Sequence, residues 1–297
     1  MIMKPVILHI HIPKTAGTSL RSSLISACDG PVYAHSKEDM ENLLRQPESY
    51  RHSINLAHGH FVYGFHKHLR EDYLNLFVVR KPKPRIYSFY RYVCSVTDHP
   101  LYKKVNGLTF GEFLDLSIKD AQVRGEINNA QVRIISGIPK FEDNKHLAFA
   151  EACRNAAEPT SIVGITEEYP KFLDVLVDRG ILPNNKEQKL NVNKKAPEYY
   201  QLTDRQNELL EEYTKLDELF YQHCKLVFDG YQSAATDSKF SNKATVNDIV
   251  SAYRLILGRN PDKEGLEHYK KEAANGMTTS ELFQCFMQSQ EYRVKTS

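Results

Sequence analysis

A lysine, a glycine and two adjacent hydroxyl residues stand close together in the stretch HIPKTAGTSL, residues 11–20. The stretch follows the apolar run 6–10 and opens a segment with the apolar spacing of a helix. The amino end of a helix presents unpaired backbone N–H groups and the positive end of the helix dipole, which suits a phosphate or sulfate. Lys14 would add a mobile positive charge, and Gly17 would let the backbone approach the anion closely. The residues that we expect to hold the anion are Lys14, Thr15, Ala16, Gly17, Thr18 and Ser19.

The same turn has a purely structural interpretation, in which Thr15 or Ser19 caps the helix and no ligand is bound. It also departs from the GxxxxGK[ST] order of nucleoside triphosphate loops. The choice between the two interpretations therefore depends on whether the rest of the chain holds further anion-binding elements.

A second basic element lies in FVVRKPKPRIYSFYRY, residues 77–92. Arg80 ends an apolar run, two prolines shape the turn, and Ser88 lies one turn into a predicted helix. An arginine and a hydroxyl placed in this way can grip a second phosphate through charge-assisted hydrogen bonds. The alternative is a solvated basic turn formed by Arg80 and Arg85.

Two histidines flank a glycine in NLAHGHFVYGF, residues 55–65. Alternate residues of an extended segment point the same way, so His58 and His60 can face one site. Imidazole, with an ordinary pKa of about 6.5, suits a general base. A metal site would need a third ligand that the neighbouring sequence does not supply. We predict that His60 or His58 is a base and that no metal is bound, the alternative being a structural role for each histidine.

These candidates lie at the ends of short apolar runs that read as buried strands alternating with helices. The alternation predicts an α/β fold with three layers, P-loop-like, around a central parallel sheet. Ligands bind such sheets outside the carboxyl ends of the strands, where the candidates fall. The expected strands are 6–12, 53–57, 74–79 and 161–165, and the expected helices between them include 15–27, 84–94 and 110–116.

In combination and order, the three elements resemble the sulfotransferase superfamily. PKTAGTS (13–19) resembles the loop for the 5′-phosphosulfate of 3′-phosphoadenosine 5′-phosphosulfate (PAPS), and RKPKPRIYSFY (80–90) resembles the 3′-phosphate motif, with Arg80 and Ser88 at its phosphate-gripping positions. HGH (58–60) is similar to the segment that carries the catalytic base in the heparan and dermatan or chondroitin sulfate 2-O-sulfotransferases, the branch most resembled, together with its bacterial relatives.

NNAQVRIISG (128–137) and SIVGITEEY (161–169) also resemble segments of the bacterial members, so the resemblance covers roughly residues 5–230. Lys81 and Lys83 depart from the family pattern, because they occupy positions that are often acidic. The turn at residues 81–83 is therefore more basic than in the family pattern, and we expect its side chains to contact different residues.

The resemblance implies transfer of a sulfuryl group from PAPS to a hydroxyl of a carbohydrate, a bacterial polysaccharide or glycoconjugate. Lys14 and Thr18 would stabilise the departing phosphate while His60, or His58, takes the acceptor proton. Sulfate carries one charge fewer than a γ-phosphoryl group, so no bridging metal is required. The alternatives are an ATP-dependent nucleoside or sugar kinase, which would want GK[ST] and an acidic metal ligand, and a catalytically silent nucleotide-binding scaffold.

Residues for the acceptor are harder to assign. Arg124, Asn129 and Arg133, and the basic stretch 66–70, can receive an anionic sugar or can be ordinary surface residues. The segment NVNKKAP, 191–197, is either a lid over the nucleotide or a polar loop.

The last part of the chain reads as a separate helical unit. An amphipathic pattern at 202–227 closes the sulfotransferase-like domain, 1–231, and the polar stretch 232–242 reads as a linker. Three short helices, 246–257, 263–274 and 279–287, make up a domain at 243–297. It resembles a small bacterial domain of unassigned function, and we expect it to bind a protein or glycan partner. Residues 260–265 imitate half of a calcium loop, but Asp262 as a helix cap explains them more simply.

Composition narrows the setting of the protein. The 297 residues carry a formal net charge of +2, so bulk charge gives no reason to expect a nucleic-acid partner. The five cysteines are widely spaced without a CxxC pair, which favours a reducing, cytoplasmic location. The first apolar run is too short and too interrupted for a signal peptide or a membrane span.

Overall fold

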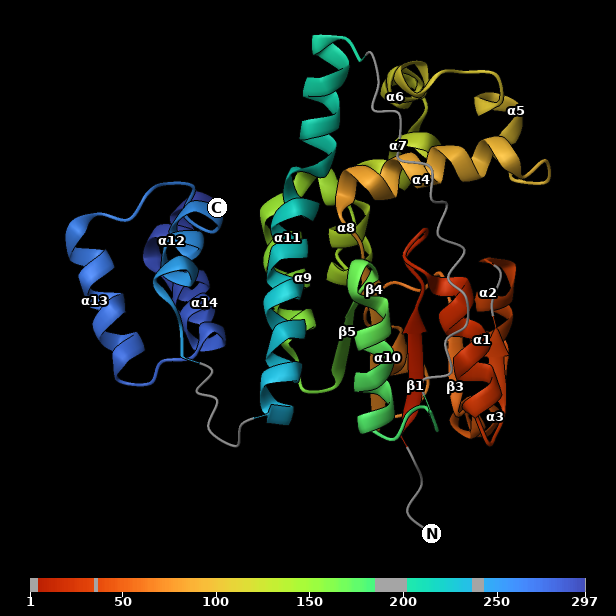
Figure 1. Ribbon diagram of the computed structural model, residues 1–297, viewed down its shortest axis with the longest axis horizontal. Helices are drawn as coiled ribbons and strands as arrows, with labels where there is room; N and C mark the ends of the chain where they lie inside the picture. Colours follow the sequence, from red (N-terminus) through yellow and green to blue (C-terminus); the bar gives the residue numbers. More distant parts are fainter. Residues whose placement is uncertain (1–4, 35–36, 185–201, 237–242, 297) are drawn as a thin grey trace.

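The computed structural model describes residues 5–34, 37–184, 202–236 and 243–296. Within these ranges five strands form one parallel sheet with the spatial order β2-β3-β1-β4-β5 (Figure 1). The predicted central parallel sheet is therefore confirmed. The strands are β1 (Val6–Ile10), β2 (Val32–Ala34), β3 (Leu56–Gly59), β4 (Tyr73–Val79) and β5 (Ser161–Ile165).

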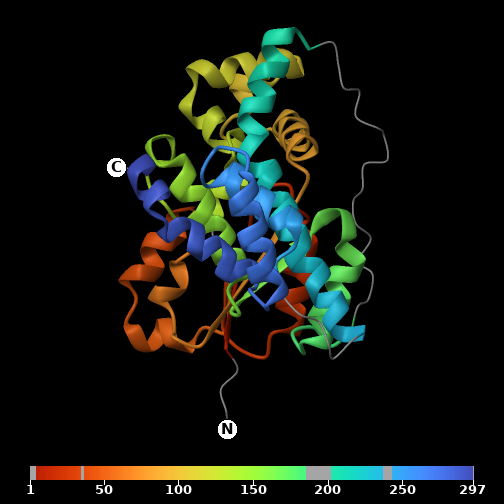
Figure 2. The ribbon, with the colours of Figure 1, turned by 90° about the vertical axis from the view of Figure 1, so that its left-hand side faces the viewer.

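Helices cover both faces of the sheet, which is why β3 and β5 are buried along their whole length. In Figure 2 the sheet lies between α1 (Gly17–Ala27) and α10 (Tyr169–Asp178) on one side and α8 (Ala130–Ser136) and α9 (Lys145–Ala157) on the other. The predicted three-layer α/β fold is thus confirmed. Shorter elements complete the connections: α2 (Lys37–Arg45), α3 (Glu48–Ser53), and the 3₁₀ turns η1 (Phe65–His68), η2 (Phe141–Asp143) and η3 (Thr166–Glu168).

A group of helices stands above the carboxyl ends of the strands and has its own apolar core (Figure 1). Phe89, Phe113 and Val123 are among the side chains of this core. The group consists of α4 (Pro82–Ser95), α5 (Tyr102–Val105), α6 (Phe110–Lys119), α7 (Ala121–Ile127) and the first part of α11 (Asp204–Thr236).

The long helix α11 joins this upper core to the core of the sheet. Leu210 packs in the upper core, whereas Phe220 and Phe228 pack in the core around the sheet. Helix α11 continues to Thr236, so residues 232–236, expected as the start of the linker, are helical. The hydroxyl of Tyr231 donates to the Ser161 carbonyl oxygen at 3.3 Å and accepts from the Val163 N–H at 3.4 Å, which ties this end of the helix to β5.

The C-terminal helices form a unit with a third core, built around Ile249, Leu282 and Phe286. Its helices are α12 (Val246–Leu255), α13 (Lys263–Ala274), α14 (Thr279–Gln288) and α15 (Gln290–Thr296). The predicted cap is confirmed, because the Asp262 carboxylate accepts from the Gly265 N–H at 2.7 Å. Helix α14 packs against α9, and the Phe283 ring meets the His223 ring of α11 edge-on at 5.9 Å.

No helix in the described part of the chain combines the length and the apolar character that crossing a membrane requires.

Candidate active site

The three predicted elements meet at one edge of the sheet. The strands β3, β1 and β4 are neighbours, and His60, the loop 11–16 and Arg80 directly follow their carboxyl ends. In a parallel sheet these ends lie side by side, so the strand order alone brings the three elements together.

The loop before α1 has the backbone shape of an anion-binding nest. Lys14 and Ala16 are in the left-handed region, with φ of 71° and 66°, on either side of Thr15. Alternating backbone conformations of this kind turn successive N–H groups toward one point. Among the described residues, no side chain caps α1 at Ala16, and the first turn of the helix holds no acidic residue. The amino end of α1 therefore suits an external anion.

Two residues of this loop have roles inside the protein. The Thr15 side chain is 1% exposed, and its hydroxyl donates to the Ile12 carbonyl oxygen at 2.9 Å. A Cβ atom on Gly17 would lie 2.0 Å from Cδ2 of the His11 ring. Gly17 therefore makes room for the His11 imidazole, a role that the sequence analysis did not predict.

Two cations lie beside the loop. Nη1 of Arg80 donates to the Lys14 carbonyl oxygen at 3.2 Å, and Nζ of Lys14 lies over the Tyr92 ring, 4.2 Å from its centre. Burial, followed by the charge of Arg80, lowers the pKa of the Lys14 ammonium. Ser88 precedes Tyr92 by one helical repeat on α4, so it lies on the face of α4 that meets the loop.

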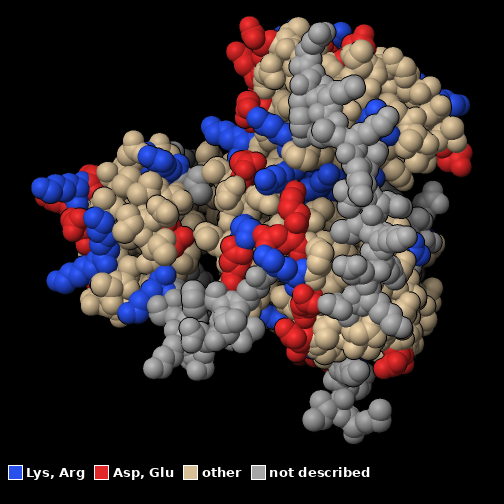
Figure 3. Space-filling view, viewed as in Figure 1, with Lys and Arg blue, Asp and Glu red and all other residues tan. Residues whose placement is uncertain are grey.

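The unusually basic turn has acidic partners. Lys83 forms an ion pair with Glu211 of α11, and the Lys81 N–H donates to Oε1 of Glu167 at 3.0 Å. Figure 3 shows basic and acidic side chains interleaved in this region, where Lys81, Lys83 and Lys215 line a cleft of about 740 Å³ between α4 and α11. The Lys83 ammonium thus has an acidic partner on α11, whereas Glu167 binds the backbone N–H of Lys81.

Four histidines form a cluster where β1 and β3 end. Nδ1 of His58 lies 2.8 Å from Nδ1 of His9, its neighbour in the sheet, and the His58 side chain is 6% exposed. The His11 ring stacks on His58 at 5.4 Å and on His60 at 4.7 Å. The two predicted base candidates therefore lie in one cluster but in different surroundings, because His58 is buried and His60 is exposed.

His60 is held by the loop itself. Its Nδ1 is 3.0 Å from the His11 carbonyl oxygen, while the His11 N–H donates to the Gly59 carbonyl oxygen at 2.8 Å. A carbonyl oxygen only accepts, so Nδ1 of His60 carries the hydrogen. In the neutral ring the lone pair is then on Nε2, the nitrogen available to take a proton.

His9 and His11 stay uncharged at ordinary pH. Burial, followed by the neighbouring His60 and His58, lowers the pKa of His11 to about 3. Burial and then His58 lower the pKa of His9 well below its ordinary value. The His11 ring that stacks on His60, and the His9 ring next to it, are therefore neutral imidazoles.

The three predicted acceptor residues differ in how far their polar atoms are already bonded within the protein. The Asn129 side chain is 3% exposed, and its Oδ1 accepts from the N–H groups of Leu216 and Asp217 at 2.8 and 3.0 Å. Nη1 of Arg133 donates to the Gly125 carbonyl oxygen at 2.5 Å. These contacts give the buried Asn129 a structural role, whereas they engage one guanidinium nitrogen of the half-buried Arg133, whose part in acceptor binding stays a prediction.

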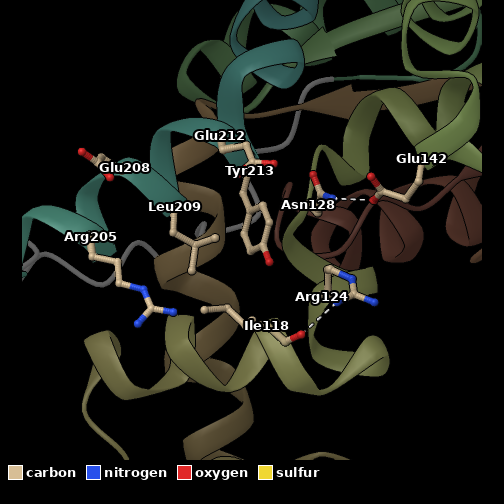
Figure 4. Close-up of a pocket in the computed structure, with 9 residues that line it drawn as sticks. All are labelled: Ile118, Arg124, Asn128, Glu142, Arg205, Glu208, Leu209, Glu212 and Tyr213. Carbon is tan, nitrogen blue, oxygen red and sulfur yellow. Dashed lines mark hydrogen bonds between the residues drawn. The ribbon is translucent and has the colours of Figure 1, made fainter.

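Arg124, by contrast, lines a pocket of about 580 Å³ between α6, α7 and α11. Figure 4 shows Arg124 and Arg205 on opposite sides of this pocket, with Tyr213 between them. Nη1 of Arg124 donates to the Ile118 carbonyl oxygen at 3.1 Å. The remaining lining residues are Ile118, Asn128, Glu142, Glu208, Leu209 and Glu212.

Two other predicted segments lie away from this edge or outside the described residues. The basic stretch 66–70 precedes the amino end of β4, where the buried His66 ring stacks on Tyr73 at 3.8 Å. It is therefore at the opposite end of that strand from Arg80. The possible lid at 191–197 is outside the described residues. Within the described ranges, no cluster of three or more His, Cys, Asp or Glu residues has a metal-binding arrangement.

Sequence reasoning missed His9, His11, Tyr92 and Gln131. The signal for the first two was present, because His9 and His11 alternate in the chain as His58 and His60 do. The contact of Tyr92 with Lys14, and that of Gln131 with Arg80 described below, join distant segments and leave no local pattern.

Comparison with known proteins gives two family matches. Residues 1–223 match the sulfotransferase family, and residues 231–296 match a domain of unknown function, DUF4214. No curated protein matches the chain. The first match covers most of the chain and includes the loop, the Arg80 turn and the histidine cluster. The chain therefore belongs to the sulfotransferase family.

Proposed function

We propose that this sulfotransferase uses PAPS as donor and a carbohydrate hydroxyl as acceptor, in the manner of the 2-O-sulfotransferase branch and its bacterial relatives. The observation that carries the proposal is the position of His60. Its exposed ring is bonded through Nδ1 to the backbone of the same loop that forms the anion nest. A proton acceptor and an anion site are thereby joined rigidly, as group transfer between two bound substrates requires.

The donor fits the two basic elements. The nest at Lys14 and Ala16, with the amino end of α1, suits the 5′-phosphosulfate, and Lys14 supplies a charge for it. Arg80 and Ser88 suit the 3′-phosphate, because Arg80 adjoins the loop and Ser88 lies on the face of α4 that meets it.

In the proposed reaction an acceptor hydroxyl oxygen bonds to the sulfur while the bond from sulfur to the 5′-phosphate oxygen breaks. Nε2 of His60 takes the hydroxyl proton, and 3′-phosphoadenosine 5′-phosphate (PAP) leaves. Lys14 and the loop N–H groups stabilise the charge that develops on the departing phosphate. His58, buried and bonded to His9, supports the cluster from behind.

For the acceptor, we propose a sugar of a polysaccharide or glycoconjugate, with Arg124 as the first candidate contact, because its pocket is lined by polar and aromatic side chains. We propose a cytoplasmic reaction, supported by five free thiols. The C-terminal domain is proposed to bind a protein or glycan partner, since every proposed donor-binding residue precedes it.

Thermal denaturation with nucleotides tests the donor. PAP at about 100 times its dissociation constant should stabilise the protein by roughly 2.7 kcal/mol, whereas ATP with Mg²⁺ should not stabilise it. Arg80→Ala should remove most of the PAP effect. Equal stabilisation by ATP with Mg²⁺ would favour a nucleoside or sugar kinase. PAP binding without PAP release from PAPS, across a panel of polysaccharide acceptors, would favour a catalytically silent scaffold.

A further inference from the structure

The backbone of Arg80 is held by a single side chain from a distant part of the chain. The Arg80 N–H donates to Oε1 of Gln131 at 2.9 Å, and Nε2 of Gln131 donates to the Arg80 carbonyl oxygen at 2.9 Å. Gln131 is fully buried, with 0% of its surface exposed. A primary amide offers one donor and one acceptor on the same group, so it satisfies both backbone groups of Arg80 as a neighbouring strand would.

Gln131 is itself fixed at the start of α8. Its N–H donates to Oδ2 of Asp217 at 3.3 Å, and the Val132 N–H donates to Oδ1 of the same carboxylate at 2.9 Å. Asn129 returns the connection by accepting from the backbone of α11. Helices α8 and α11 are thus locked together, and the Gln131 amide has a rigid base.

The residues on either side of Arg80 are fixed in the same way. Oγ1 of Thr166 donates to the Val79 carbonyl oxygen at 2.9 Å, and Oε1 of Glu167 accepts from the Lys81 N–H at 3.0 Å. Three successive residues are therefore bound through their backbones by side chains from other elements. Arg80 lies just beyond the last residue of β4, so it is not part of the strand. Side-chain bonds to its backbone therefore help to keep its guanidinium in one position.

We propose that Gln131 is a positioning residue for Arg80 and determines how strongly the enzyme prefers nucleotides that carry a 3′-phosphate. The inference rests on the proposed donor site, in which Arg80 binds that phosphate. Gln131 fixes the end of β4, and the Arg80 guanidinium reaches from there to the Lys14 carbonyl oxygen. The distance between the 3′-phosphate contact and the 5′ loop is set by this arrangement. A nucleotide without the 3′-phosphate does not use it.

Gln131→Glu separates this role from a merely structural one. An ionised carboxylate keeps the shape of the amide and its acceptor but cannot donate to the Arg80 carbonyl oxygen, whereas a protonated carboxyl group can. Asn155→Asp is the matched control, because Asn155 is a buried amide, 3% exposed, whose Nδ2 donates to the Ile135 carbonyl oxygen at 2.8 Å away from Arg80. Gln131→Met, which introduces neither a charge nor an N–H or O–H donor, is measured beside it.

The measurement is the affinity of the full chain for PAP and for adenosine 5′-monophosphate, by calorimetry with competition. We expect the Gln131 variants to reduce the preference for PAP about tenfold, the size of one lost hydrogen bond, with the monophosphate affinity changed less than twofold. Asn155→Asp should keep the wild-type ratio. If both Gln131 variants keep the wild-type ratio of affinities, or bind both nucleotides equally more weakly, the role of Gln131 is overturned while the proposed donor still stands. A wild-type enzyme without preference for PAP overturns the proposed donor as well.

Discussion

The imidazole of His60 differs from its three histidine neighbours in its surroundings, although all four lie in one cluster. His9 and His58 are bonded to each other inside the protein, and the His11 ring is wedged against Gly17. His60 is exposed and has one nitrogen committed to a backbone carbonyl oxygen. The position of His60 therefore favours proton transfer, whereas the positions of the other three histidines favour a structural role in the cluster.

His60→Ala should abolish sulfuryl transfer, with a loss of roughly 10²-fold or more in rate, while PAP affinity stays nearly intact. PAP release with a carbohydrate acceptor, beside PAP binding by calorimetry, measures both. Lys14→Ala is the contrast, because loss of its charge should weaken binding and turnover together. His58→Ala should mainly lower stability, because it leaves the buried His9 ring unpaired. Wild-type turnover in His60→Ala would rule out this base.

Gly17→Ala should destabilise the protein, because the new methyl group would overlap the His11 ring. We expect a decrease of about 1–3 kcal/mol in the free energy of unfolding, measured in urea. Adding His11→Ala should recover part of that decrease, which a double-mutant cycle detects. Gly230→Ala is the control, since a Cβ there would meet open space within a helix. Equal effects of the two glycine changes would contradict the role of His11.

The buried His66 should make the fold sensitive to acid. Burial, followed by Lys67, lowers the pKa of His66 to about 4. Between pH 6.5 and 4 the unfolded chain binds this proton and the folded chain does not, so the free energy of unfolding decreases as the pH falls. His66→Gln should reduce that slope by up to roughly 1.4 kcal/mol per pH unit. Denaturant unfolding at several pH values measures it, with the exposed His146→Gln as control. An unchanged slope would contradict the assignment.

Among the elements, α11 connects separate parts of the fold, because it contributes side chains to two cores and packs against β5 near its end. Its last turns are held by the Tyr231 hydroxyl and by the Arg179 guanidinium, which lies 4.5 Å from the centre of the Tyr231 ring. The helix therefore packs against the sheet as far as Tyr231.

Tyr231→Phe should lower the free energy of unfolding by about 1–2 kcal/mol, because it leaves backbone groups of β5 without this partner. Thermal or urea denaturation measures the change. Leu226→Ala on the same helix, where the side chain is 58% exposed, should have little effect. A Tyr231→Phe protein as stable as wild type would show that the hydroxyl does not secure the helix.

The sequence predicted the elements whose apolar pattern is long or sharply bounded. Strand β5 was expected at its observed bounds, 161–165, because turn-forming residues enclose an apolar run. The strand expected from residue 53 begins at Leu56, since α3 continues to Ser53. Strand β2 was missed because it has only three residues. Side-chain bonds between distant segments leave no local sequence pattern, so the structural role of the buried Asn129 was not predicted.

At the scale of the whole molecule, the C-terminal domain packs against α9 and α11 of the sheet domain. Phe283 meets His223, and α14 packs on α9, while the donor site lies at the carboxyl ends of the strands. The domain therefore has its own core and lies away from the carboxyl ends of the strands.

A chain ending at Thr236 should fold and bind PAP within about twofold of the full chain, because it keeps Tyr231 and every proposed donor-binding residue. Calorimetry on both proteins checks this expectation. A chain ending at Val227 should be much less stable, since it lacks the fully buried Phe228 as well as Tyr231. Loss of PAP binding in a folded 1–236 protein would show that the C-terminal domain completes the site.

The strand order also determines when each strand can pair during synthesis of the chain. β4 lies between β1 and β5 in the sheet, yet residues 80–160 separate it from β5 in the sequence. At a ribosomal rate of about 5–20 residues per second, the outer edge of β4 waits roughly 4–16 seconds for its partner. During that interval the apolar strand presents unpaired N–H and C=O groups. The nascent enzyme is then open to pairing with other chains, and this interval is when a chaperone would benefit it most.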